Sequence, residues 1–265
     1  MRRLTKGIIT AMAAMLFVAC DNIDSDDRLV YVKPEAAQKA VLIEDFTGQL
    51  CSNCPTAIEV IDSLQQELGD TAVIAVGIHS GPFGFSGNSK FRGFMTDLGN
   101  IYYDYWGIQS QPMGVIDRLG TCSYQMWKTT VYNQMRQKAP LSLSLTNSYD
   151  ADSRKLDISV SALGTDGNTT GKLQLWLVED SLVDIQTLPD GSYNLTYVHS
   201  HVLRDAVNGT WGTDFSVAEG QQVESSFSYT LPTDWVAKNI SVVAFVYKSD
   251  GSGVQQATKR HIVEQ

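Results

Sequence analysis

Two cysteines three residues apart are the residues of this chain best suited to covalent chemistry. Cys51 and Cys54 stand in Cys51-Ser52-Asn53-Cys54-Pro55, between an apolar run and an amphipathic segment. At the start of a helix, such a pair can close a disulfide within one turn, and the helix dipole favours a thiolate on Cys51. The spacing therefore predicts thiol–disulfide exchange, in which Cys51 attacks and Cys54 resolves the mixed disulfide.

Two other interpretations of the cysteine pair stay open. A purely structural disulfide would use the same spacing. The pair is also half of a zinc site, but the sequence has no second such pair, and its four histidines are scattered, so we expect no metal and no cofactor. Cys122 is either a buried free thiol or a resolving or intermolecular partner. The four histidines are His79, His199, His201 and His261.

The N-terminus has the pattern of an exported lipoprotein. A basic start is followed by a short apolar stretch over residues 8–18, and then by Ala19-Cys20. This order predicts a signal peptide over residues 1–20 and resembles the bacterial lipobox, in which the cysteine is diacylated. An ordinary secretory signal is the alternative. Residues 21–35 predict an acidic tether, either a surface-export signal or a solvated spacer.

Composition excludes several classes of partner. The formal charge is −9, and loss of the three cations of the leader would take it to −12, so nucleic acid is not an expected partner. After the leader the sequence has no run of about 18 apolar residues, so we expect no transmembrane helix. The predicted attachment to the membrane is the lipid on Cys20.

Alternating strand-like and helix-like segments position the cysteine pair. Residues 41–46 predict a strand, Pro55 begins an amphipathic helix, and residues 72–78 predict a buried parallel strand. Together they form a strand–helix–strand unit with a right-handed crossover. Three further elements are expected: a helix over residues 89–105, a strand over 113–117 and a helix over 123–138.

From Pro140 onward the sequence is typical of an all-β structure. Residues 141–145, 156–160, 173–177 and 227–231 alternate apolar and polar positions, and further strands are expected near 195–204, 239–248 and 254–262. About seven short strands separated by turn signals predict an immunoglobulin-like β-sandwich over residues 140–265.

Asp45 and Pro112 extend the cysteine motif. Asp45 lies on the predicted strand six residues before Cys51, and Pro112 precedes the next predicted strand. In this order the residues resemble thioredoxin. The resemblance implies a thioredoxin-like α/β domain over residues 36–139, Asp45 as proton acceptor of the resolving thiol, and a cis-proline at Pro112. Glu44 is the alternative inward-facing carboxylate.

The whole chain resembles the outer membrane protein 28-related lipoproteins of gut and oral Gram-negative anaerobes. The shared motifs are Cys20, residues 46–55, 112–118, 201–205 and 209–212. The resemblance implies a lipid-anchored protein of the outer membrane or cell surface. Two functions follow from the motifs. One is a thiol–disulfide oxidoreductase acting on extracytoplasmic proteins, and the other is a non-enzymatic binding or adhesion lipoprotein that uses a redox-inert thioredoxin scaffold.

Overall fold

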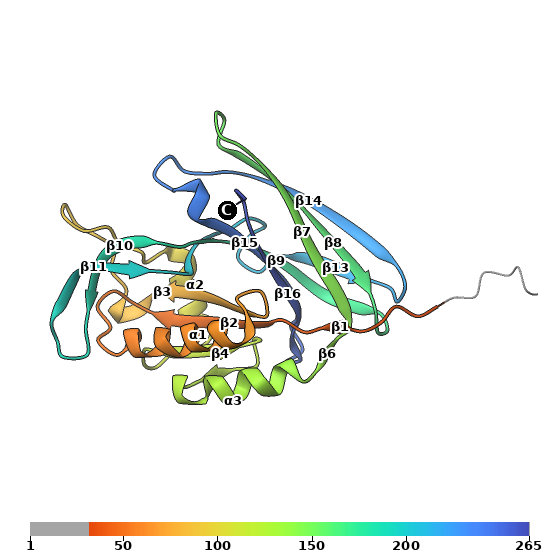
Figure 1. Ribbon diagram of the computed structural model, residues 1–265, viewed down its shortest axis with the longest axis horizontal. Helices are drawn as coiled ribbons and strands as arrows, with labels where there is room; N and C mark the ends of the chain where they lie inside the picture. The colour runs from red at the N-terminus through yellow and green to blue at the C-terminus, as the bar shows by residue number, and fades with distance from the viewer. Residues whose placement is uncertain (1–31, 265) are drawn as a thin grey trace, which may run out of the picture. The chain divides into compact units, whose positions relative to one another are not determined.

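The computed structural model describes residues 32–264 (Figure 1). The predicted signal peptide, Cys20 and most of the predicted tether lie outside the described residues. Residues 33–264 belong to one compact unit. Among the described residues, no helix combines the length and the apolar character that a membrane crossing needs.

The described part of the chain is built mostly from strands. The helices are α1 (Cys54–Leu68), η2 (Gly81–Phe83), α2 (Asp97–Tyr105), α3 (Tyr124–Met135) and η3 (Ala237–Asn239). The strands are β1 (Ala37–Gln38), β2 (Val41–Thr47), β3 (Val73–His79), β4 (Met113–Ile116), β5 (Thr121–Cys122), β6 (Lys138–Ala139), β7 (Leu141–Asp150), β8 (Lys155–Gly164), β9 (Thr169–Glu179), β10 (Leu182–Thr187), β11 (Tyr193–His199), β12 (Val202–Ala206), β13 (Thr213–Val217), β14 (Gln222–Thr230), β15 (Ile240–Lys248) and β16 (Gly253–His261).

Within residues 32–264, the largest sheet has nine strands drawn from both predicted halves of the chain (Figure 1). Its order is β16-β15-β9-β12-β3-β2-β4-β5, and β13 also pairs with β9. Strands β2 and β3 are parallel, β4 is antiparallel to β2, and β12 joins β3 in parallel. The division into residues 36–139 and 140–265 stays a prediction, since one sheet runs through both.

Helices cover both faces of β2, which explains why all seven residues of this strand are buried. Val41 and Ile43 pack with apolar residues of α1 and α3. Leu42 and Phe46 point to the opposite face and pack with Tyr102 of α2. Because successive side chains of a strand alternate, Asp45 shares the α1 face and Glu44 shares the α2 face.

A second layer of strands gives the later part of the chain its sandwich-like character. Among the described residues, β14, β8 and β7 form a three-stranded sheet that packs on β9 and β15. Strand β8 alternates strictly between buried and less buried residues, as its sequence predicted. The prediction of about seven strands after Pro140 was too small a number, because the described residues of this part contain ten strands, β7 to β16.

Two predicted elements were wrong in extent. The helix expected over 89–105 begins only at Asp97, after Thr96, whose Oγ1 accepts a hydrogen bond from the Gly99 N–H at 2.9 Å. A Cβ at Gly93 would lie 2.1 Å from backbone of Ser86, so the preceding segment is a tightly folded loop. The strand expected over 195–204 is divided, because His201 has a φ of 60° between β11 and β12.

Candidate functional site

The cysteine pair lies where the sequence places it, at the start of α1. Cys51 and Cys54 form a disulfide with a Cα–Cα distance of 5.4 Å. Each residue is only 2% exposed. Pro55 stands in the first turn of the helix, where its missing N–H costs no intrahelical hydrogen bond.

The loop between β2 and α1 is held by close backbone contacts. A Cβ at Gly48 would lie 2.0 Å from the carbonyl oxygen of Phe83, so that only glycine allows the two backbones to approach. The side chain of Gln49 is fully buried, accepts a hydrogen bond from the Phe94 N–H at 3.0 Å and donates one to the Arg92 carbonyl at 3.0 Å. The loop that carries Cys51 therefore has a defined conformation.

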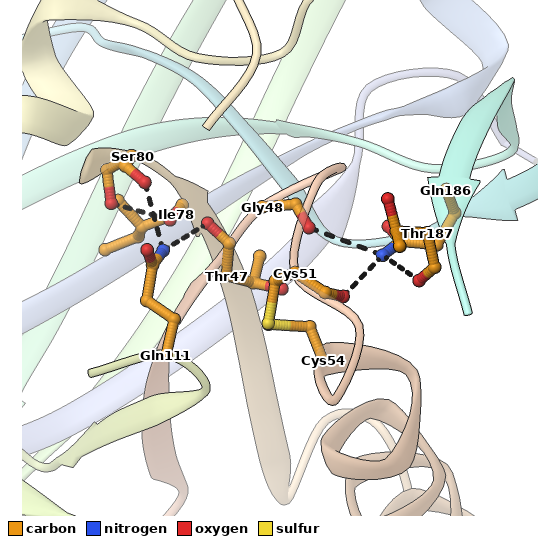
Figure 2. The surroundings of a disulfide bond; sticks show 9 residues. All are labelled: Thr47, Gly48, Cys51, Cys54, Ile78, Ser80, Gln111, Gln186 and Thr187. Atoms are coloured by element: carbon orange, nitrogen blue, oxygen red, sulfur yellow. Dashed lines mark hydrogen bonds between the residues drawn. A yellow bond between two sulfur atoms is a disulfide. The ribbon is translucent and has the colours of Figure 1, made fainter. Parts of the chain in front are cut away.

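The hairpin of β10 and β11 packs against this loop from the later part of the chain (Figure 2). The Gln186 amide Nε2 donates to the Cys51 carbonyl at 2.9 Å and to the Gly48 carbonyl at 3.4 Å. The Thr187 N–H donates to the Gln49 carbonyl at 2.9 Å. These bonds tie the hairpin to the backbone of the disulfide loop, which contributes to the burial of both sulfurs.

Asp45 is fully buried on the face of β2 that α1 covers. Its register partners on the two neighbouring strands are Gly77 and Gly114, which offer no side chain to pair with it. Within residues 32–264, neither carboxylate oxygen of Asp45 has a hydrogen-bond partner. Burial raises the pKa of Asp45 from 3.8 to about 8, since removal from water disfavours the charged form.

Glu44, the alternative carboxylate, lies on the other face. The Arg118 Nε donates to its Oε1 at 3.0 Å, and both side chains are buried. The two neighbours therefore have different environments: Glu44 belongs to a buried ion pair, whereas Asp45 lies on the side of the cysteines.

The peptide bond between Gln111 and Pro112 is cis, as the sequence predicted. The Gln111 side-chain amide donates to the carbonyls of Thr47 at 2.7 Å and Ser80 at 3.0 Å (Figure 2). Because Thr47 ends the strand that leads to the cysteine loop, these bonds connect the proline turn to the end of β2.

A small cavity of about 100 Å³ adjoins the disulfide. Its lining includes Cys54, Asp62 and Gly77, together with Tyr197 of the hairpin. Burial raises the pKa of Asp62. Gly77 is the register partner of Asp45, so the cavity lies next to the strand position of the buried carboxyl.

His79 and His199 also line this cavity, with ring centroids 5.5 Å apart. Burial lowers the pKa of His199 to about 4 and that of His79 well below its ordinary value, so both rings are neutral near pH 7. No group of three metal-ligating side chains occurs among the described residues. His201 lies beyond β11 and does not share a strand with His199.

The structure thus gathers Asp45, the cysteine pair and Pro112 around the end of β2, and adds residues that sequence reasoning did not select. Gln186 is 135 residues from Cys51, and nothing in its local sequence distinguishes it from other glutamines. His199 was noted only as one of four scattered histidines. The arrangement of a disulfide at a helix start beside a buried carboxyl is suited to thiol–disulfide exchange.

Known proteins resemble the chain in fold and in family. HBP35 of Porphyromonas gingivalis superposes with a TM-score of 0.68 at 17% identity, covering 87% of this chain and 80% of that chain, which shows a shared fold. A domain of the outer membrane lipoprotein Omp28 from Porphyromonas gingivalis is 28% identical over 48% of this chain and 91% of that chain, with a TM-score of 0.36. No curated protein matches the sequence.

A family match confirms the resemblance seen in the sequence. The family described as outer membrane protein Omp28 matches residues 99–265, which is more than half of the chain. The matched residues begin after the cysteine motif. On this match, the chain belongs to the Omp28 family and is located at the outer membrane.

Proposed function

We propose that the chain is an outer-membrane lipoprotein, anchored through Cys20, that carries out thiol–disulfide exchange on extracytoplasmic proteins through Cys51 and Cys54. In this proposal, residues 36–139 act as a thioredoxin-like unit. Asp45 carries the argument, because an unpaired buried carboxyl destabilises a fold and is retained most readily where it serves in proton transfer.

The exchange balances in thiols, protons and electrons. A thiolate of a reduced protein partner attacks Cys51 Sγ, the bond to Cys54 breaks, and the Cys54 thiolate takes a proton from the Asp45 carboxyl. A second partner thiolate attacks the partner sulfur of the mixed disulfide and releases Cys51 as a thiolate. The partner loses two electrons, which the cysteine pair gains, and the reverse sequence reduces a partner disulfide.

A specific observation favours a second candidate, a binding lipoprotein with a structural disulfide. Cys51 and Cys54 are each 2% exposed and lie against the β10–β11 hairpin. A nucleophile has to reach the sulfur of Cys51, so exchange on a protein partner requires the hairpin to move. Asp45 and the helix start therefore support thiol–disulfide exchange, whereas the burial of Cys51 and Cys54 supports a structural disulfide.

The reduction potential of the cysteine pair separates the two functions. We expect the purified chain, equilibrated in dithiothreitol or glutathione buffers, to show a reversible couple between about −120 and −270 mV and to reduce insulin. A reduction potential below about −300 mV, without reduction of insulin, would show that the disulfide is structural and would overturn the proposal. Cys51→Ser should abolish turnover, and Cys122→Ser, which removes the free thiol, should leave it unchanged.

Anchoring has its own test. Replacement of Cys20 by serine removes the sulfur that would carry the lipid, so the variant should leave the membrane fraction while the parent chain stays in it. Detergent-resistant retention of Cys20→Ser in the membrane fraction would contradict attachment through this cysteine.

A further inference from the structure

A second cavity, away from the disulfide, is lined by aromatic rings and cations. It measures about 400 Å³, within the range of roughly 300–1,000 Å³ typical of small-molecule sites. Its walls come from α2, from the segment after β12 and from β15, and its lining residues are Tyr105, Trp106, Arg118, Lys172, Trp211, Tyr247, Lys248, Ser249 and Gly251.

The aromatic walls are accessible and inclined to one another. Tyr105 is 63% exposed, and its ring centroid lies 4.5 Å from Trp211 and 5.1 Å from Trp106. The interplanar angles of these two pairs are 52° and 81°. Because these rings contact one another, a ligand can lie only against their outer faces, where a pyranose ring can place its C–H groups.

The charge of the lining is positive. Arg118, Lys172 and Lys248 line the cavity, and no carboxylate does. The carboxylates nearby lie behind or outside the lining: Glu44 pairs with Arg118 beneath it, and Asp214, which is 95% exposed, pairs with Lys172 at 2.8 Å. Asp250 lies near Lys248 and accepts hydrogen bonds from Ser252. A ligand carboxylate can therefore approach Lys248 from the solvent side, and it competes with Asp214 for Lys172.

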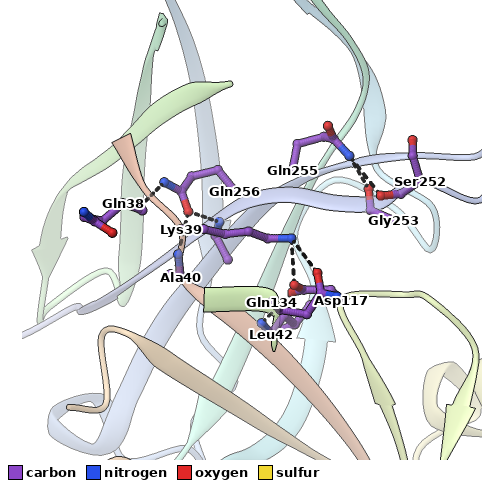
Figure 3. Close-up of polar contacts among 11 residues, drawn as sticks. Gln38, Lys39, Ala40, Leu42, Asp117, Gln134, Ser252, Gly253, Gln255 and Gln256 are labelled. Carbon is purple, nitrogen blue, oxygen red and sulfur yellow. Dashed lines mark hydrogen bonds and ion pairs between the residues drawn. The ribbon is translucent and has the colours of Figure 1, made fainter. Parts of the chain in front are cut away.

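Arg118 is held at the base of the cavity by an unusual turn. Asp117 and Arg118 both have positive φ values, 49° and 58°, a conformation that costs free energy in residues other than glycine. Lys39 pairs with the Asp117 carboxylate at 2.8 Å, and the Leu42 N–H donates to it at 2.9 Å (Figure 3). These buried contacts keep the turn in place.

The turn brings the guanidinium of Arg118 among aromatic faces. Its Cζ lies 4.2 Å from the Tyr247 ring centroid, and the Tyr247 hydroxyl donates to the Trp211 carbonyl at 2.8 Å. A Cβ at Gly253 would lie 2.2 Å from the Asp117 carbonyl, so the β15–β16 turn closes tightly against the same segment. Arg118 of motif 112–118 and Trp211 of motif 209–212 meet at this cavity.

We infer that this cavity binds a carboxylated sugar, of which a hexuronate is the simplest example. The exposed ring of Tyr105 and the adjoining ring of Trp211 receive a C–H face of the pyranose on their outer sides. Lys248 binds the carboxylate, and Lys172 adds to its attraction. This binding is independent of thiol–disulfide exchange and goes beyond it.

Calorimetric titration of the full chain with glucuronate tests the inference. We expect glucuronate to bind about tenfold more tightly than glucose, since glucose lacks the charge that the lysines recognise. Its affinity should also fall as salt is added. Absence of glucuronate binding at millimolar concentrations, equal affinity for glucose, or tighter binding of benzoate than of glucuronate would each overturn the inference.

Two variants test whether glucuronate binds at this cavity. Lys248→Gln and Trp211→Leu should each weaken glucuronate binding at least about fivefold, while Lys238→Gln, an exposed lysine elsewhere, should not change it. Circular dichroism of each variant checks that it is folded. Unchanged affinity in both folded cavity variants would overturn the assignment. Cys51→Ser should bind glucuronate normally, so that a failure of this site and a failure of the redox proposal are distinguishable.

Discussion

Among residues 32–264, Asp45 is the buried carboxylate with neither an ion pair nor a hydrogen bond. Asp184 also has no ion pair, but it accepts hydrogen bonds from the Arg92 and Ile185 N–H groups. Glu44 pairs with Arg118 at 3.0 Å, Asp117 with Lys39 at 2.8 Å, and Glu179 with Arg204 at 3.1 Å. Since glycines flank Asp45 on both neighbouring strands, side-chain packing across the sheet does not compensate for its burial. Its protonated form is therefore the one that the fold accommodates at neutral pH.

Stability should depend on pH through Asp45. Its pKa is near 3.8 when unfolded and about 8 when folded, so between these values the folded chain retains a proton that the unfolded chain releases. The contribution of Asp45 to the free energy of unfolding is complete below pH 3.8. It falls by up to about 1.4 kcal/mol per pH unit as the pH rises, and it is lost once the pH has passed through about 8. We expect Asp45→Asn to remove this decline. Urea unfolding across that pH range measures it.

A matched variant separates this effect from the titration of other groups. Asp152 is exposed, so Asp152→Asn should leave the pH dependence of unfolding as it is in the parent chain. If Asp45→Asn kept the same decline as the parent chain, the raised pKa of Asp45 would be refuted.

At the scale of elements, the β10–β11 hairpin packs against the loop that carries the disulfide. It meets the cysteine loop through the side chain of Gln186 and the backbone of Thr187. The opposite face of the hairpin is open, with Val183 59% exposed and Val198 55% exposed. An element with one exposed face can open locally at lower cost than the fully buried strands β2 and β3.

Loss of the Gln186 side chain should make the disulfide more accessible. Gln186→Ala removes the bonds to the Cys51 and Gly48 carbonyls, and one net hydrogen bond of about 1 kcal/mol corresponds to a roughly fivefold larger open population. We therefore expect about fivefold faster reduction by dithiothreitol, followed by thiol labelling. Val183→Ala, on the exposed face, should reduce at the parent rate. An unchanged rate in Gln186→Ala would exclude the hairpin as the barrier.

At the scale of the whole molecule, one sheet couples the cysteine region to the sandwich-like layer. Strand β12 pairs with both β3 and β9, so the parallel strands near the disulfide and the long antiparallel strands share a continuous hydrogen-bond network. Trp176 and Phe245 of the later strands pack in the same core as Phe46 of β2. The apolar side chains of β2 and those of the later strands therefore cover one another.

Unfolding in urea should therefore occur in one transition. Among the described residues, the three α-helices all end by Met135, so the helical far-UV signal reports the first half. Three of the five tryptophans, Trp176, Trp211 and Trp235, lie in the second half, so the fluorescence signal is weighted toward that half. We expect the two signals to have the same midpoint. Separate midpoints would show that residues 36–139 fold independently, as the predicted division into domains implies.

Local sequence patterns were sufficient for the elements around the cysteine pair. The apolar run of β2, the proline at the first turn of α1 and the alternation of β8 each depend on interactions within a few residues. Strand β2 and helix α1 lie within a residue of their expected positions, and β8 includes the predicted residues 156–160 but continues to Gly164. The cis bond at Pro112 was also anticipated, because its place in the order of elements was known. The helix predicted over residues 89–105 was too long at its N-terminal end. The segment before α2 is held in a loop by the close approach of Gly93 to Ser86, and helical periodicity does not reveal such a contact.

The sequence by itself determined the chemistry available to this protein: a cysteine pair at a helix start and a carboxyl on the strand beneath it. The leader with a lipid-accepting Cys20 stays a prediction. Only the tertiary structure decided what surrounds that chemistry. Gln186 reaches Cys51 across 135 residues, and Trp211 meets Arg118 at the second cavity. Contacts at such separations depend on the register of nine strands in one sheet, which periodicity within a single segment does not encode.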